Sequence, residues 1–153
     1  MRKHYLSFLS LLLPAFLILS GHPVVKAQQG GSSAVKGGRW SDSATWADRK
    51  VPGAGAVVTI AKDMEVVLDV SPPPLHGLTI NGKLSFADNK DLELTTEWIM
   101  LHGTLEIGTE AKPYTRNATI TLTNNVPGED IDTMGDRGIM LMEIGRASCR
   151  ERV

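Results

Sequence analysis

Apolar and polar residues alternate in short runs between residues 57 and 123, and glycine, proline and asparagine separate these runs. A period of two places one row of side chains on a buried face and the other in solvent, as in a half-buried β-strand. No stretch shows the apolar spacing of an amphipathic helix. The pattern therefore predicts an all-β fold. The expected strands span 57–60, 65–69, 78–80, 83–86, 91–94, 97–100, 104–107 and 118–123.

Aliphatic residues recur at intervals of 20 or 21 positions along these runs. A period near 20 predicts a right-handed parallel β-helix, or β-solenoid, whose coils stack one strand on the next around a continuous aliphatic ladder. A β-sandwich is the alternative, because two strands can share such a period and Asn81-Gly82 has the composition of a hairpin turn. The recurring positions are Ile60, Ile80, Met100 and Ile120, and Leu84 with Leu105.

The first 27 residues have the layout of a secretory signal peptide. A basic start, Met1-Arg2-Lys3-His4, precedes an apolar run over 6–19, and small residues end at Ala27. The apolar run is shorter than the roughly 20 residues of a membrane-spanning helix. We therefore expect cleavage after Ala27, no membrane span in the mature chain, and a secreted protein (periplasmic or cell-surface in a bacterium). Residues 28–36 are rich in Gly, Ser and Gln and predict a flexible leader.

The last eleven residues, 143–153, show no apolar periodicity and resemble the translation of a common sequencing adapter. Our hypothesis is that they are an artefact, so they are excluded from reasoning about the fold. Without both ends, residues 28–142 carry 10 basic and 15 acidic side chains and no cysteine. This acidic balance argues against a basic nucleic-acid-binding surface, and the missing cysteines exclude a disulfide scaffold.

Three segments in order carry a resemblance to a known family. Trp40-Ser-Asp-Ser-Ala-Thr-Trp46 is followed by Leu78-Thr-Ile-Asn-Gly-Lys-Leu84 and by His102-Gly-Thr-Leu-Glu-Ile-Gly108. This series resembles the G-eight domain, named for its eight glycines, over residues 37–142. The resemblance implies an exported or cell-surface protein, extracellular polysaccharide as the partner class, and a domain that continues beyond Met142 in its relatives. The domain in this chain is therefore expected to be truncated.

Aromatic and basic residues near the start of the domain are the candidate ligand-binding residues. Trp40 and Trp46 could stack on sugar rings, with Arg39 and Arg49 beside them, or the tryptophans could seal the end of a β core. Trp98 lies within a strand run and is expected in the core. Asn117-Ala-Thr is a glycosylation sequon at the head of a strand.

Clustered carboxylates leave three interpretations open: an acid and base pair for glycosidic bonds, calcium ligands, or a solvated acidic face. Residues 128–136 are the segment most similar to a calcium loop but lack the spacing of a calcium-binding hand. His76 and His102 could meet on adjacent coils, with a surface or packing role as the alternative. No catalytic motif or other cofactor motif is present. The clusters are Asp63, Glu65, Asp69, Asp88, Asp91 and Glu93, and Glu129, Asp130, Asp132 and Asp136.

The sequence therefore predicts a secreted binding or structural module of a larger polysaccharide-interacting protein, not an enzyme on its own. A fragment of a glycan depolymerase acting on a hyaluronan-like polymer and a β-solenoid cap without a ligand are the alternatives.

Overall fold

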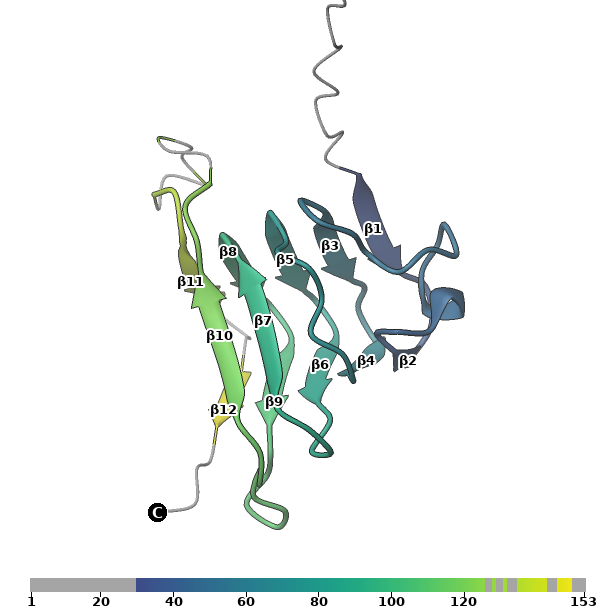
Figure 1. Cartoon of the computed structure of the whole chain (residues 1–153), viewed down its shortest axis with the longest axis vertical. Coiled ribbons are helices and arrows are strands. Elements are labelled where there is room, and N and C mark those ends of the chain that lie inside the picture. The colour runs from purple at the N-terminus through teal and green to yellow at the C-terminus, as the bar shows by residue number, and fades with distance from the viewer. Residues whose placement is uncertain (1–29, 126–127, 129–130, 132–134, 143–145, 150–153) are drawn as a thin grey trace, which may run out of the picture.

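A computed structural model describes residues 30–125, 128, 131, 135–142 and 146–149. In this part of the chain the only helix is one short 3₁₀-helix, and all other regular structure is β-strand (Figure 1). The elements are β1 (Gly31–Ala34), β2 (Gly38–Arg39), η1 (Ser43–Thr45), β3 (Val57–Ile60), β4 (Glu65–Leu68), β5 (Gly77–Ile80), β6 (Lys83–Phe86), β7 (Leu92–Thr96), β8 (Trp98–Leu101), β9 (Thr104–Ile107), β10 (Ala118–Leu122), β11 (Gly138–Leu141) and β12 (Arg146–Cys149).

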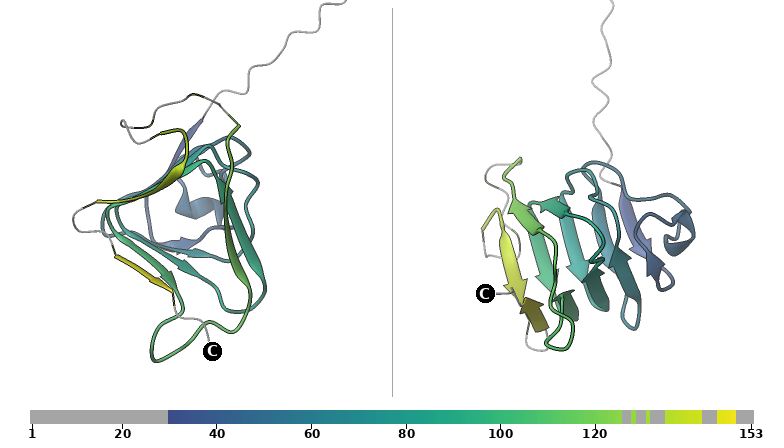
Figure 2. Two further views of the ribbon diagram at one scale, coloured as in Figure 1. Left: turned by 90° about the vertical axis from the view of Figure 1, so that its left-hand side faces the viewer. Right: turned by 60° about the horizontal axis from the view of Figure 1, so that its bottom comes forward.

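The strands form three parallel sheets. The first has the order β1-β3-β5-β8-β11, the second β12-β9-β6-β4-β2, and the third contains β10 and β7. Consecutive strands such as β3 and β4 lie in different sheets, so the chain passes from one sheet to the next before it returns. Figure 2 shows the sheets as walls around a shared interior. The all-β prediction is confirmed, and each of the eight expected strands overlaps an observed one.

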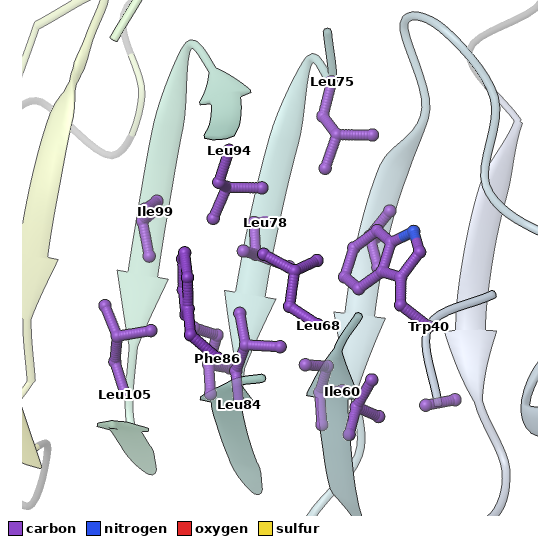
Figure 3. Close-up of a cluster of buried hydrophobic side chains, with 14 of the residues drawn as sticks. Trp40, Ile60, Leu68, Leu75, Leu78, Leu84, Phe86, Leu94, Ile99 and Leu105 are labelled. Carbon is purple, nitrogen blue, oxygen red and sulfur yellow. The ribbon is translucent and has the colours of Figure 1, made fainter. Parts of the chain in front are cut away.

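The alternating pattern fills this interior. In β3 the side chains of Val58 and Ile60 are fully buried, whereas those of Val57 and Thr59 are only partly buried. The same alternation recurs in β6, β8 and β9. Aliphatic side chains from the different sheets meet in one core (Figure 3), and their burial is the main stabilising contribution to the fold.

The aliphatic ladder differs from the expected series by one residue. Ile60 lies beside Ile80, but Ile80 lies beside Leu101 rather than Met100. Leu101 is fully buried, whereas Met100 is partly exposed on the other face of β8. The predicted place of Ile120 in this ladder was also wrong, because its strand, β10, pairs with β7 in the third sheet. The pair of Leu84 and Leu105 is confirmed as direct neighbours.

The Asn81-Gly82 segment does not form the hairpin that the sandwich alternative would use. The strands on either side of it, β5 and β6, belong to different sheets, and each pairs in parallel with another strand, β5 with β3 and β6 with β4. Asn81 and Gly82 instead turn the corner between two sheets, and both backbone amides donate to Ile60 O.

The segment expected as a flexible leader contains β1. This strand pairs in parallel with β3 and places Ser32 and Ala34 against the interior. Small side chains suit this position, because Trp40 and Trp46 already fill the adjacent end of the core. Two small inward residues give a weak hydrophobic signal, which is why the sequence did not reveal this strand.

Replacing Leu101 and Met100 separately tests the register of β8. We expect Leu101→Ala to lower the free energy of unfolding by about 2–3 kcal/mol, because the change leaves a cavity in the core. The matched variant Met100→Ala should cost less than about 1 kcal/mol, because this side chain is partly solvated. Urea denaturation measures both values, and equal losses would contradict the register.

Candidate functional site

A pocket of about 240 Å³ lies where β6 and β9 end. The connection from β9 to β10 forms its other wall and is seen at the lower end of the sheets in Figure 1. The residues that line it include two aromatic residues, Phe86 and Tyr114, and several residues with hydrogen-bonding side chains. Its lining residues are Ser85, Phe86, Ala87, Asp88, Glu106, Gly108, Thr109, Lys112 and Tyr114.

The wall formed by the second sheet carries a charge ladder. Lys83 Nζ lies 3.1 Å from Glu65 Oε1 and 3.2 Å from Glu106 Oε1. The hydrogen bond to Glu65, followed by that to Glu106, raises the pKa of Lys83 above its ordinary value. Of the two carboxylates only Glu106 lines the pocket. Lys83 therefore fixes the position of Glu106 and compensates part of its charge.

The connecting loop is held in a defined shape on the opposite side. Gly108 has a φ of +69°, and a Cβ there would lie 2.5 Å from Tyr114 N, so only glycine fits. Thr109 N donates to Lys112 O at 2.8 Å, and Lys112 N donates to Thr109 Oγ1 at 3.0 Å. These contacts hold Lys112 at the pocket rim. Within the described residues its ammonium group forms no hydrogen bond or ion pair, but its charge helps to lower the pKa of Asp88.

The pocket floor consists of two aromatic side chains with little exposure. Phe86 and Tyr114 expose 6% and 8% of their surface. Tyr114 donates its hydroxyl to Ala87 O at 3.2 Å, and burial, followed by the nearby carboxylates, raises the pKa of Tyr114 above its ordinary value. Both residues belong to the hydrophobic core, so they offer little apolar surface to the pocket.

Several carboxylates in the predicted acidic clusters connect segments that lie 26 to 28 residues apart in the sequence. Asp88 Oδ1 accepts from Thr115 N and Oγ1, both at 2.9 Å. Asp91 accepts from Asn117 N at 3.0 Å and Asn117 Nδ2 at 3.1 Å. Asp69 accepts from the amide and hydroxyl of Ser41. These carboxylates are structural clamps, which is a role that the sequence interpretation did not include.

These hydrogen bonds favour the ionised form of each carboxylate. The backbone amide of Thr115 is the main cause that lowers the pKa of Asp88, and that of Asn117 has the same effect on the pKa of Asp91. Burial alone would raise the pKa of Asp69, but the hydrogen bonds from Ser41 outweigh it and the pKa is lowered.

Lowering the pH is therefore expected to reduce the free energy of unfolding of the protein. Because the folded-state pKa values lie below the unfolded value of 3.8, the clamps stabilise fully above that value and lose their contribution as the pH falls through the folded-state values. The urea midpoint should drop between about pH 5 and pH 2, and Asp91→Asn should show a shallower drop. Asp63→Asn is the control, since Asp63 makes no such bond in the described part of the chain. An equally steep drop in both variants would contradict the assignment.

Trp40 and Trp46 pack together at the end of the core next to β1. Their ring centroids are 4.9 Å apart at 71°, and Trp46 Nε1 donates to Trp40 O at 2.9 Å. Trp40 is 0% exposed and Trp46 is 1% exposed, so neither ring offers a face to a ligand. The burial supports the alternative in which the tryptophans seal the core, and it gives no support to sugar stacking.

Arg39 and Arg49 lie on the surface. Arg39 ends β2, where its charge helps to lower the pKa of Asp69. Arg49 adopts a φ of +54° in the loop after Trp46. Their side chains remain available to a ligand, but without an aromatic face beside them.

The two histidines do not meet. His76 precedes β5 and His102 follows β8, so they lie at opposite ends of neighbouring strands. His76 Nδ1 instead lies 3.2 Å from Glu97 Oε1, and both side chains are almost completely buried. Glu97 Oε2 is buried and has no hydrogen-bond partner among the residues that the structure describes. Sequence spacing alone could not reveal this pair, because it depends on the one-residue offset of β8.

Trp98 lies outside the core, contrary to expectation. It is partly exposed on the outer face of β8, and its indole covers Gly77 of β5, where a Cβ would overlap the ring. Glycine at position 77 therefore makes room for Trp98.

The calcium-like segment lies mostly outside the described residues, which include Asp136 but not Glu129, Asp130 or Asp132. Among the described residues, no three His, Cys, Asp or Glu side chains are grouped closely enough to hold a metal ion. Within the same residues, no helix is long and apolar enough to cross a membrane. The predicted signal peptide also falls outside the described part. Asn117 is exposed at the head of β10, and its glycosylation stays a prediction.

Comparisons with known proteins agree on one family. A family model described as the G8 domain matches residues 45–149. Human fibrocystin-L is 33% identical over 106 residues, which cover 68% of this chain and 2% of the relative. Fibrocystin from Mus musculus is 35% identical over 91 residues, which cover 58% of this chain and 2% of the relative. No solved structure matches the chain.

The chain matches about 2% of the length of these curated relatives. The family match extends to residue 149, and β12 pairs in parallel with β9 inside the segment that the adapter hypothesis covers. That hypothesis concerns the DNA, so it stays a prediction that resequencing of the gene would test.

Proposed function

Because the chain belongs to the G8 domain family, we propose that it is an extracellular binding module of a larger protein and that its partner is a polysaccharide. The expected signal peptide and the family resemblance support the extracellular location. The small share of each relative that the chain matches supports a module rather than a whole protein. The pocket beside β6 and β9 supports binding, because its lining includes polar side chains that form no hydrogen bond or ion pair within the described residues.

The architecture that we propose for this module is a right-handed parallel β-helix. Parallel strands that recur in the same sheet after a crossover support it, as does the continuous interior. Crossovers between parallel strands of one sheet are right-handed in about 98% of cases, which supports the handedness.

Secretion and glycan binding can be tested on the same sample. The full chain should be exported when it is expressed with its N-terminal segment, and N-terminal sequencing of the product should begin at Gln28. The purified product should bind polysaccharides on a glycan array. Retention in the cell would contradict the location, and an array without any binding would contradict the partner class.

A β-solenoid cap without a ligand is the second candidate. The buried pair of Trp40 and Trp46 favours this candidate, because the terminal coil of a solenoid must cover the end of the core. An empty glycan array combined with a well-folded product would support this candidate.

A further inference from the structure

Three polar groups in the pocket between β6, β9 and the following loop lack partners. Within the described residues, Glu106 Oε2, Ser85 Oγ and Lys112 Nζ take part in no hydrogen bond or ion pair. Ser85 and Glu106 are neighbours on the outer face of the second sheet, since Ser85 lies beside Glu106 in the register of β6 and β9. An acceptor, a hydroxyl and a cation therefore surround one small hollow.

These groups can form hydrogen bonds with the hydroxyl groups of a sugar. A carboxylate accepts hydrogen bonds from hydroxyl groups, an ammonium donates to them, and a serine hydroxyl does both. The pocket is smaller than the roughly 300–1,000 Å³ of a site for drug-sized ligands, so it would hold a single ring.

The charges around the pocket select against acidic sugars. Asp88 and Glu106 line it against one lysine, and Lys83 on the outer wall is already shared by two carboxylates. Residues 28–142 also carry five more acidic than basic side chains. A polyanionic chain would meet repulsion at long range and would find only Lys112 as a cation in the pocket lining, where the charge of Asp88 already offsets it.

We propose that this pocket binds one uncharged pyranose unit of a neutral polysaccharide. Glu106, Ser85 and Lys112 hold the ring hydroxyls. This assignment rests on the proposed function and narrows it, because it specifies the class of glycan and moves the site away from Trp40 and Trp46.

The test measures binding of oligosaccharides to the full secreted chain by titration calorimetry. The probes are neutral cello-, xylo-, manno- and galacto-tetrasaccharides, with a hyaluronan oligosaccharide as the acidic probe. At least one neutral probe should bind. Glu106→Gln and Lys112→Ala should each weaken that binding about tenfold, as expected for the loss of a hydrogen bond to a charged group.

Glu65→Gln is the matched control for Glu106→Gln. It removes the other carboxylate that contacts Lys83 but does not alter the pocket lining, so the affinity should stay within about twofold. An equal loss in Glu65→Gln, or no loss in the two pocket variants, would overturn the assignment of the site. Binding of hyaluronan alone would overturn the neutral class and leave the proposed function standing. The absence of binding to every glycan on the array would remove the proposed function itself.

Discussion

Gly103→Ala is expected to lower the free energy of unfolding by about 3 kcal/mol, the upper end of the usual cost of overpacking. Gly103 turns the corner between β8 and β9, and a Cβ there would overlap the carbonyl oxygen of Gly82 and lie 2.6 Å from Asn81 O. Neither of these atoms belongs to a flexible side chain, so the backbone around Gly103 and that around Gly82 must separate to make room. Both atoms also lie within a hydrogen-bonded corner, because Thr104 N donates to Gly82 O and Gly103 N donates to Ile80 O.

Thermal unfolding measures this effect, with an expected fall in Tm of roughly 10 °C or more. Gly53→Ala is the matched control, because nothing lies within 4 Å of a Cβ at position 53 and its φ is not in the left-handed region. That control should stay within about 0.5 kcal/mol of the unmodified chain. If Gly103→Ala were as stable as Gly53→Ala, the close stacking of the two corners would be wrong.

The same corners explain how much of the fold the sequence could predict. Alternation located β3 to β10 correctly, because burial of every second residue leaves a local signal. The 20-residue interval failed at Met100, because β8 starts 21 residues after β5 and one extra residue reverses which side chains face inward. The pairing of β8 with β11 could not be predicted from a 20-residue interval, because β11 starts 40 residues after β8. The chain between them includes β9, β10 and long connections.

The candidate site was harder to predict, for a different physical reason. Ser85, Glu106 and Lys112 come from two strands and a loop, and only the register of β6 and β9 brings the first two together. Trp40 and Trp46 were predicted as ligand-binding residues because aromatic side chains suit both a core and a sugar. Sequence alone cannot distinguish these roles, because they differ only in whether the ring faces are covered.

Trp46→Ala is expected to lower the free energy of unfolding by about 4 kcal/mol, which is within the usual range for removing a buried tryptophan. Trp46 is 1% exposed, packs edge-on against Trp40, and forms an antiparallel bridge with Ala34 of β1. Its removal leaves a cavity at the end of the core and takes away the support for β1. Urea denaturation followed by circular dichroism would measure the loss.

Trp46→Phe separates packing from hydrogen bonding at the same position. Phenylalanine keeps most of the apolar contact but loses the hydrogen bond from Nε1 to Trp40 O, so the loss should be nearer 1–2 kcal/mol. Both variants should keep the affinity for any bound oligosaccharide under conditions in which they are folded, because the ring faces are covered by the protein itself. A folded Trp46→Phe variant that lost glycan binding would instead place Trp46 in the binding site, and the tryptophan pair would then need an opening motion to reach its ligand.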